Sequence, residues 1–347
     1  MTFAFNFLPP EEGTTNANDD ASPGSCESAG AKQTDFNASS GGSSADQQHP
    51  FQWVEQLENL LEERAKQEIV FQEVSLLKED ILSDVENEEK DPKTQSSKKP
   101  LRRVCMEQYQ QEVTPGVYEG GLQVWECSLD LVRYFQQHNL RLTKGSALEL
   151  GAGHALPGCW LLREALKDYQ KEKKGDGKSA ENSNNNANFT MTFVDFNDYV
   201  VKDATLSNIV LNTSDLLYAD AARLARLNMV ELGFGDWNDM SRKFKADGGR
   251  RFDWIMAAET TYTTEAAKDT AELLLNHLVV DTGIGWIASK RYYFGVGGGT
   301  DALREAAQLL SQNSGSSHYL KVETVWVVDN GVGNIREILK VNCHRKE

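Results

Sequence analysis

Hydrophobic and polar positions divide the chain into a polar beginning and a patterned remainder. Residues 1–50 are rich in Gly, Ser, Asn, Asp and Thr, with almost no aliphatic side chain after Leu8. Such a composition cannot bury enough surface to offset the entropy lost on ordering, so we expect a disordered arm. Phe3, Phe5 and Phe7 alternate with small residues, which suits a strand, a groove-docking segment or a frayed terminus.

Residues 51–104 combine a helical pattern with a charged linker. Apolar side chains recur every three or four residues over 51–69, which predicts a helix with one apolar stripe. The stripe consists of Val54, Leu57, Leu61, Ala65 and Ile69. Residues 79–99 are charged and rich in Ser and should form a linker.

From residue 109 onward, short β-rich runs alternate with helical periods, which is typical of an α/β domain. We expect strands at 146–150, 189–195, about 228–233, 252–257 and 284–289. We expect helices at 124–138, 156–170, 199–212, 265–278 and 301–311. Two last runs, 319–328 and 335–341, flank Asn330-Gly331, a strong signal for an antiparallel hairpin. The pattern predicts a Rossmann-like sheet of seven strands that ends in this hairpin.

Charge narrows the range of partners. The formal net charge is −16, and residues 1–104 contribute 20 acidic and 10 basic side chains, a net of −10. This balance argues against direct nucleic-acid binding and against an anionic membrane, and it favours a basic partner. The sequence has no apolar run of membrane-spanning length and no signal-peptide pattern. Five scattered cysteines without a CxxC pair, and histidines without ligand spacing, predict no metal site.

A glycine turn follows the first predicted parallel strand. Glu149 precedes Gly151-Ala152-Gly153-His154-Ala155, just before a predicted helix. Glycine allows a sharp turn and a close approach of the backbone to a ligand. The pattern admits S-adenosylmethionine, a dinucleotide or an ordinary tight turn, and by itself it does not separate them.

Acidic residues after the next two strands strengthen the ligand interpretation. Asp195 ends the second strand, where a carboxylate meets ribose hydroxyls in nucleotide-binding folds. Asp236 follows the third strand and can accept a hydrogen bond from an adenine amino group. Trp237 alone would more often be a core residue, but beside these two acidic strand ends we expect its face to stack on the ligand.

Several longer motifs resemble those of the histidine protein methyltransferases of the seven-β-strand class. They are GGLQVWECSLDL (120–131), DFN (195–197), GDW (235–237), ETTY (259–262) and ASKRYYFGVGGG (288–299). The resemblance covers residues 116–338 and the first seven residues. It implies a class I methyltransferase domain over 105–347, S-adenosyl-L-methionine as cofactor, and methylation of a histidine in a basic, large-subunit ribosomal protein in cytosol and nucleus. Ala155 and Glu149 depart from the family, which often has Gly and Asp there, as does the Asn-rich stretch 171–188.

Carried over residue by residue, the resemblance implies a cofactor pocket. Its residues would be Trp125, Glu126, Cys127, Gly151, Ala152, Gly153, Asp195, Phe196, Asn197, Gly235, Asp236, Trp237 and Ala258. Trp125 and Cys127 also suit a purely structural place on the apolar face of a helix.

Methylation of an imidazole requires alignment more than a strong base, because an imidazole with a pKa near 6.5 is mostly neutral at pH 7. Glu259, after the fourth strand, is the candidate catalytic residue that would accept from the second ring nitrogen and fix the tautomer. The alternative is a structural ion pair with Lys290 or Arg291. We expect His154 to form hydrogen bonds with the backbone. We expect the loop at 295–299, with Tyr293 and its aromatic neighbours, either to shape the entrance through which the acceptor histidine reaches the site or to be a plain connection.

Three other functions remain open from the sequence. A lysine methyltransferase of the same fold would share the cofactor motifs. A silent protein that escorts a basic ribosomal protein would need the fold but not Glu149, Asp195 and Asp236 together. A dinucleotide oxidoreductase would use a similar glycine turn and would be separated by cofactor titration.

Overall fold

Seven long strands form the centre of the protein, as the alternating pattern predicts. The computed structural model describes residues 49–69, 71–74, 101–104, 113–114, 117–175, 187–218, 220–312, 315–329, 331 and 334–346. The predicted strands are β4 (Gly145–Leu150), β5 (Phe189–Asp195), β6 (Val230–Phe234), β7 (Trp254–Ala258), β8 (Ile284–Lys290), β9 (His318–Val328) and β10 (Arg336–Arg345). The sheet order is β1-β6-β5-β4-β7-β8-β10-β9, and β10 runs antiparallel to both of its neighbours.

The Rossmann-like prediction is confirmed, and the terminal hairpin lies where the sequence predicts it. Strands β4 to β8 are parallel, and the chain runs outward from β4 to β6 before it returns to β7. The direction of winding therefore reverses between β4 and β7. In an open parallel sheet, ligands bind at the carboxyl ends of the strands beside such a reversal.

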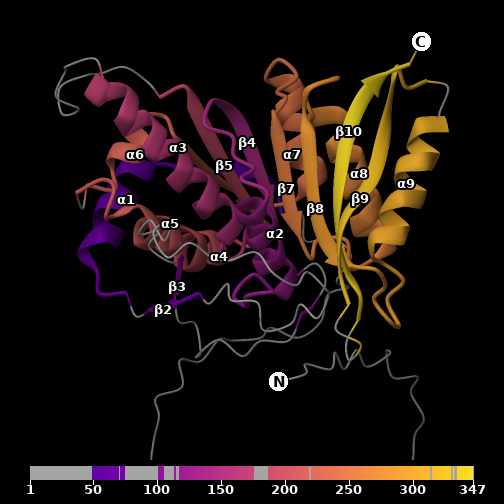
Figure 1. Cartoon of the computed structure of the whole chain (residues 1–347), viewed down its shortest axis with the longest axis horizontal. Coiled ribbons are helices and arrows are strands. Elements are labelled where there is room, and N and C mark those ends of the chain that lie inside the picture. Colours follow the sequence, from indigo (N-terminus) through magenta and orange to yellow (C-terminus); the bar gives the residue numbers. More distant parts are fainter. Residues whose placement is uncertain are drawn as a thin grey trace, which may run out of the picture. The chain divides into compact units, whose positions relative to one another are not determined.

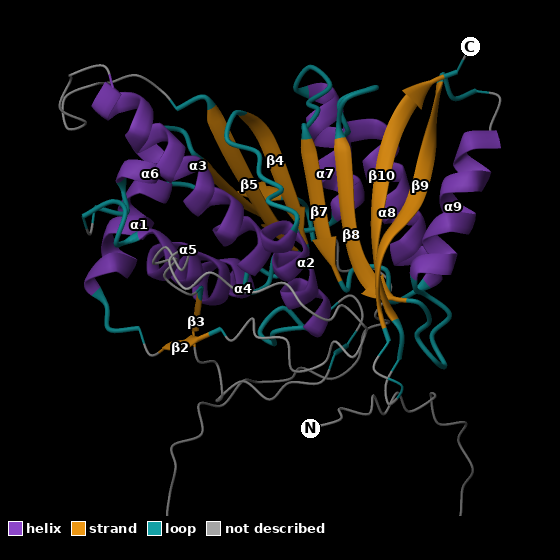
Figure 2. Ribbon diagram, viewed as in Figure 1, coloured by secondary structure: helices purple, strands orange, loops and turns teal. Residues whose placement is uncertain are grey.

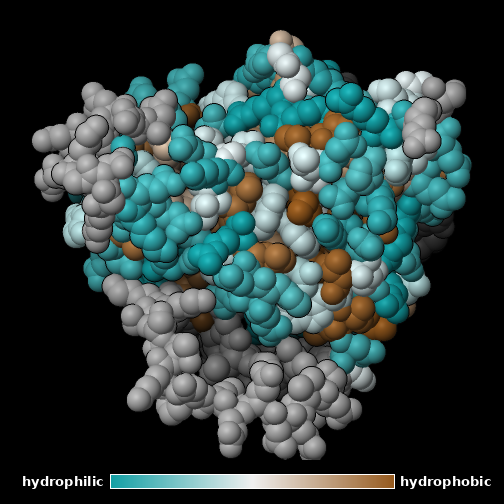
Figure 3. Space-filling view, turned by 45° about the horizontal axis from the view of Figure 1, so that its top comes forward, coloured by the Kyte–Doolittle hydropathy of each residue, from teal (hydrophilic) through white to brown (hydrophobic). Residues whose placement is uncertain are grey.

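Helices cover both faces of the sheet (Figures 1 and 2). One face carries α2 (Glu126–Gln137), α3 (Leu156–Gly175), α4 (Asp198–Val200), α5 (Leu206–Thr213) and α6 (Arg223–Arg226). The other carries α7 (Trp237–Ala246), α8 (Thr264–His277) and α9 (Thr300–Gln312). Each face has its own apolar core: Phe135 and Trp286 belong to the first, Phe244 and Leu274 to the second. Figure 3 shows hydrophobic residues as small patches among hydrophilic ones on one face of the surface.

The segment at 51–69 differs from its prediction as one continuous helix. Its first part forms a short strand, β1 (Gln52–Trp53), antiparallel to the edge of β6, and α1 spans only Leu57–Lys66. Gln56, with φ of 52°, separates the two. Pairing with β6 overrides the local helical pattern, while the apolar stripe is retained because Leu61 is fully buried.

Two further regions depart from the pattern. The predicted helix at 199–212 contains a wide π turn, Val201–Thr205, which places the Thr205 hydroxyl 2.7 Å from the Gly153 carbonyl oxygen that accepts its hydrogen bond. A two-stranded sheet, β2 (Phe71–Glu73) with β3 (Arg102–Val104), and the helices α6 and α7 were not predicted.

Several predictions fall wholly or mainly outside the described residues. They are the disordered arm, the acidic linker, most of the Asn-rich stretch, and the turn at Asn330. The division of the chain at residues 50 and 104 stays a prediction. No helix among the described residues is both long and apolar enough to cross a bilayer.

Candidate active site

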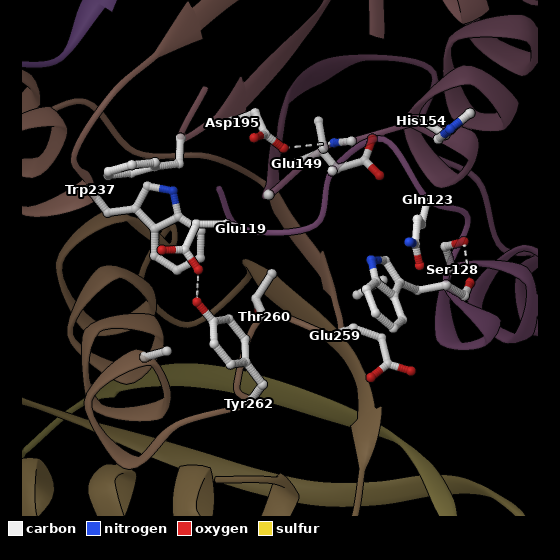
Figure 4. A pocket seen from close by; sticks show the side chains of 18 of the residues that line it. Glu119, Gln123, Ser128, Glu149, His154, Asp195, Trp237, Glu259, Thr260 and Tyr262 are labelled. Atoms are coloured by element: carbon white, nitrogen blue, oxygen red, sulfur yellow. Dashed lines mark hydrogen bonds between the residues drawn. The ribbon is translucent and has the colours of Figure 1, made fainter. Parts of the chain in front are cut away.

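A cavity of about 340 Å³ lies at the carboxyl ends of β4, β5, β6 and β7, beside the reversal between β4 and β7 (Figure 4). Nine of the thirteen predicted cofactor residues line it. They are Trp125, Gly151, Ala152, Gly153, Asp195, Phe196, Asp236, Trp237 and Ala258. The candidate catalytic residue, Glu259, lines it as well. The structure therefore brings most of the predicted site together, and it does so where the topology favours a ligand.

The glycine turn has the tight left-handed geometry that its sequence suggests. Gly151 and Gly153 have φ of 59° and 49°, and a Cβ on Gly153 would lie 2.9 Å from the Gly121 carbonyl oxygen. Ala155 also takes a positive φ, 52°. An alanine in this conformation costs about 1 kcal/mol, so the turn is strained at this position.

Asp195 joins the glycine turn to the end of β5. Its Oδ2 accepts from the Gly153 N–H at 2.9 Å and its Oδ1 from the Asn197 N–H at 3.3 Å. Burial raises the pKa of Asp195 to about 6, against the lowering effect of the backbone hydrogen bonds. The carboxylate is fixed at the cavity wall, and accepting these bonds does not exhaust its acceptor capacity.

Glu149 is a buried carboxyl group beneath the turn. Its Oε2 accepts from the Gly158 N–H at 2.9 Å, and only 3% of the residue is exposed. Burial raises the pKa of Glu149 to about 8, with the Gly158 hydrogen bond lowering it and Asp195 raising it further. Near pH 7 the side chain therefore holds a proton, which a nearby ligand cation would help to release.

Asp236 and Trp237 start α7, a helix that the sequence reasoning overlooked. Asp236 is its N-cap, and its Oδ1 accepts from the Asp239 N–H at 2.9 Å. Trp237 lines the cavity but also packs against the apolar core, so it belongs to both environments that the sequence suggested. Its indole N–H is buried and lacks a hydrogen-bond partner among the described residues.

The four other predicted cofactor residues do not line the cavity. Glu126 pairs with Arg336 at 3.1 Å on the surface side of α2, and Cys127 is fully buried. Asn197 donates to the Val117 carbonyl oxygen at 2.8 Å, and Gly235 lies against Phe51. Each of these four residues directly follows or precedes a lining residue in the sequence, so the sequence reached the cavity wall but not the side chains that face it.

Glu259 is buried at the end of β7 with an unusual backbone, φ of 58°. Its Oε2 accepts a short hydrogen bond from the Tyr293 hydroxyl and lies 3.7 Å from the Lys290 ammonium nitrogen. Its Oε1 is buried without a hydrogen-bond partner within the described part of the chain. Arg291, the other suggested partner, pairs with Glu337 instead. The ion pair that the sequence offered as an alternative is thus present on one oxygen only.

His154 has the structural role that we expected. The Asn208 side-chain amide donates to its Nδ1 at 3.1 Å, so its Nε2–H donates to the Leu122 carbonyl oxygen at 3.0 Å. Burial lowers the pKa of His154 to about 4, which keeps the ring neutral. Both ring nitrogens are engaged, and this leaves no free position for chemistry.

Glu119 and Tyr262 line the cavity and were missed as site residues. The Tyr262 hydroxyl donates a short hydrogen bond to Glu119, which joins the segment before α2 to the loop after β7 (Figure 4). Thr260 also lines the cavity, with a buried hydroxyl that has no partner in the described structure. Glu119 directly precedes the quoted GG motif and Tyr262 lies in ETTY, so motif position was the available signal.

Comparison with known proteins identifies relatives. No family model matches the chain. "Histidine protein methyltransferase 1 homolog" of Dictyostelium discoideum is 30% identical over 230 residues, which are 66% of this chain and 60% of that protein. The homologue of Bos taurus is 25% identical and covers 64% of this chain and 55% of its own length. The protein of Schizosaccharomyces pombe with the name "Histidine protein methyltransferase 1" is 26% identical and covers 61% of this chain and 64% of its own length. The resemblance to the histidine protein methyltransferases is confirmed.

The chain spans about three fifths of the length of these histidine protein methyltransferases. Solved structures are more distant. The O-methyltransferase from Bacillus cereus in complex with SAH gives a TM-score of 0.37 at 13% identity, covering 64% of this chain and 92% of that one. TomG from Streptomyces achromogenes, an O-methyltransferase in complex with SAM, gives 0.35 at 10%, covering 64% and 92%. The assignment of the fold therefore rests on the strand order of the chain itself.

Proposed function

We propose that this protein is an S-adenosylmethionine-dependent protein-histidine N-methyltransferase, with a large-subunit ribosomal protein as substrate. The observation that carries the proposal is the acid-lined cavity at the reversal of the sheet, in a homologue of histidine protein methyltransferases. S-adenosylmethionine would supply an electrophilic methyl group on a sulfonium centre. The residues of this chain would bind the cofactor, orient the acceptor ring and exclude water.

The charge of the cavity fits a cationic ligand. Seven of its lining residues carry carboxyl groups, and no lysine or arginine is found among the described lining residues. The seven are Glu119, Glu149, Asp195, Asp236, Glu259, Glu265 and Asp269. A sulfonium with an amino group is attracted by this lining, whereas the pyrophosphate of a dinucleotide would be repelled. The charge thus favours S-adenosylmethionine over the oxidoreductase alternative.

Buried polar atoms without partners also fit a ligand of this kind. Trp237 Nε1, Thr260 Oγ1 and Glu259 Oε1 belong to three lining residues and make no hydrogen bond within the described residues. Unpaired buried polar groups are rare because each costs about 1–3 kcal/mol, so a bound ligand is a reason for them to persist. We assign Asp195 to the ribose hydroxyls, Asp236 to the adenine amino group and Trp237 to stacking.

The acceptor is a neutral imidazole, for which the site needs no strong base. Glu259 would accept a hydrogen bond from one ring N–H, which leaves the lone pair of the other nitrogen for the methyl group and offsets the charge that the ring gains. The site is less suited to methylation of a lysine side chain. The lining carboxylates, apart from the protonated Glu149, would stabilise its ammonium form, which has no lone pair.

The decisive experiment uses the full chain with labelled S-adenosylmethionine and purified large ribosomal subunits. Acid hydrolysis of the modified protein should yield labelled methylhistidine, and Asp195→Ala should lose most of the label because cofactor binding is weakened. Labelled methyllysine would instead support the lysine enzyme. Binding of the subunit proteins without transfer of a methyl group would support a catalytically inactive protein that binds ribosomal proteins.

The partner and location follow from the proposed substrate. Ribosomal proteins are basic, which suits the net charge of −16 of this chain, and we propose the cytosol and the nucleus as its locations. No direct nucleic-acid contact is proposed, because the charge disfavours a phosphate backbone. Among the described residues, no cluster of His, Cys, Asp and Glu has the arrangement of a metal site.

A further inference from the structure

A chain of buried hydroxyl groups leads to Glu259. Thr261 Oγ1 donates to Ser289 Oγ at 2.8 Å, Ser289 Oγ lies 3.1 Å from the Tyr293 hydroxyl, and Tyr293 donates to Glu259 Oε2. All four residues are buried. They come from the ends of β7 and β8 and from the glycine-rich loop that follows β8.

The donor order in this chain is fixed by chemistry. Tyr293 donates its single hydroxyl proton to Glu259 Oε2. Ser289 must then donate to the Tyr293 oxygen, and it accepts the proton of Thr261. Burial, then the negative charge of Glu259, raises the pKa of Tyr293 well above its usual value, so the phenol keeps the proton that it donates.

These contacts occupy one oxygen of Glu259 and not the other. Lys290 approaches the same Oε2, and its ammonium group also lies over the rings of Trp125 and Tyr293, 5.7 and 5.5 Å from their centroids. Oε1 is left without a hydrogen bond inside the described structure, and the other protonated group near the carboxylate is the buried thiol of Cys127, whose pKa is raised by burial and then by the Glu259 charge. The left-handed backbone at Glu259 is a strained conformation for a glutamate, and such strain persists only where the surroundings hold it.

We propose that Tyr293 is a positioning residue that selects which ring nitrogen of the acceptor histidine is methylated. The hydrogen bond from Tyr293 to Oε2 fixes the plane of the Glu259 carboxylate. The other oxygen, Oε1, then accepts a hydrogen bond from only one N–H of the acceptor ring. That hydrogen bond admits one tautomer, whose other nitrogen carries the lone pair. The inference rests on the proposed function and adds the origin of its regiochemistry.

The hydrogen bond also explains why Tyr293 is buried, although we had expected it to line the acceptor mouth. Tyr293 is 7% exposed and does not line the cavity at the strand ends, although it borders a more open hollow formed by the glycine-rich loop itself. Its neighbour Phe294 is 83% exposed. The glycine-rich loop is bonded to the loop after β7, with Gly299 N–H donating to the Thr261 carbonyl oxygen at 2.6 Å. The loop thus carries Tyr293 inward to Glu259 rather than outward to solvent.

The test compares Tyr293→Phe with wild type on purified large ribosomal subunits, with Tyr319→Phe as the matched control. Tyr319 lies on β9, partly exposed, and its variant loses the same hydroxyl group away from the cavity. The readout is the ratio of the two N-methylhistidine isomers after hydrolysis, measured by chromatography and mass spectrometry. Wild type and Tyr319→Phe should give one isomer. Tyr293→Phe should give both, with kcat lowered about 10- to 100-fold, the effect of one hydrogen bond to a charged group.

Affinity for S-adenosylhomocysteine, measured by calorimetry, should stay within about twofold in Tyr293→Phe, because the cofactor half of the cavity keeps its contacts. A single isomer from Tyr293→Phe would overturn the inference whatever the rate. If that variant fails to fold, Ser289→Ala removes the donor to the Tyr293 oxygen and should broaden the isomer ratio in the same direction; an unchanged ratio there would also overturn it. Absence of methylhistidine from wild type would overturn the proposed function, and the inference with it.

Discussion

Glu149 and Glu259 end or follow neighbouring strands, β4 and β7, and both are buried, yet their surroundings differ in kind. Glu149 has a backbone N–H as its one hydrogen-bond donor in the described structure, and burial raises its pKa to about 8. Glu259 has a phenol hydroxyl and a lysine ammonium group. The proposed cofactor half of the cavity, beside Glu149, therefore lacks a counter-charge until a cationic ligand supplies one, whereas the proposed acceptor half, beside Glu259, carries its own.

The largest effect should come from the proton on Glu149. The folded protein holds it up to about pH 8, whereas an unfolded glutamate releases it near pH 4.3. In the ligand-free protein, Glu149 should thus contribute a loss of stability of about 1.4 kcal/mol per pH unit as pH rises between these values. Glu149→Gln should remove this contribution and leave, below about pH 6, the one from Asp195, whose pKa burial raises to about 6. Urea unfolding at pH 5, 6 and 7 measures the slope, with exposed Glu172→Gln as control. An unchanged slope in Glu149→Gln would mean that Glu149 is ionised in the folded protein.

The counter-charge of Glu259 gives the next effect. Lys290→Met leaves a buried carboxylate without its cation and should lower the free energy of unfolding by about 3 kcal/mol. Adding Glu259→Gln should recover part of this loss, because the charge that needed the cation is gone. Denaturant unfolding of the two single variants and the double variant forms the cycle. Strictly additive losses would show that Lys290 does not stabilise Glu259.

The ligand contacts of the cofactor half should come third. Asp195→Ala should weaken S-adenosylhomocysteine binding by about 1–3 kcal/mol, the loss expected when ribose hydroxyls lose a charged acceptor. Asp198→Ala, a change at a half-exposed carboxylate paired with Lys202, is the control. Calorimetry measures the affinity of both variants for S-adenosylhomocysteine. If Asp195→Ala binds as tightly as Asp198→Ala and wild type, Asp195 is not part of the ligand site.

Trp237 should have the smallest effect. If its ring stacks on the adenine, Trp237→Ala should weaken binding by about 1 kcal/mol and should abolish part of the fluorescence change on ligand addition. Trp326→Ala, at the packed junction of β9 with Tyr134, is the control for fluorescence. Loss of the cooperative melt in Trp237→Ala would assign this residue to the core instead.

Parallel strands and long amphipathic helices were predictable because their patterns are local. Strands β4 to β10 follow the predicted runs within a few residues, since each is apolar and bounded by turn signals. Strand β1 was not predictable, because its two residues are strand only through pairing with β6. Helix α7 was predictable in principle, because Asp236 is a residue type that favours the N-cap of a helix. We interpreted the GDW motif only as part of a ligand site.

The site shows the same division. Residues at strand ends, such as Asp195 and Ala258, reach the cavity because the topology determines where strands end. Side chains one position away are less predictable, since Cys127 and Asn197 turn into the protein while their neighbours line the cavity. The partners of Glu259 depend on a loop that returns from β8, and no spacing in the sequence predicts that return.

The short strand β1 has a consequence for how much of the chain the cavity requires. The carbonyl oxygen of His49 accepts from the Asp236 N–H at 2.9 Å, the Phe51 N–H donates to Asp239 at 2.7 Å, and Leu61 fills a fully buried position. A fragment that starts at residue 105 would expose the edge of β6, empty that position and release the start of α7 beside the cavity. A shortened version of the chain therefore has to begin at or before His49, because the wall of the cavity is built in part by sequence that precedes residue 105.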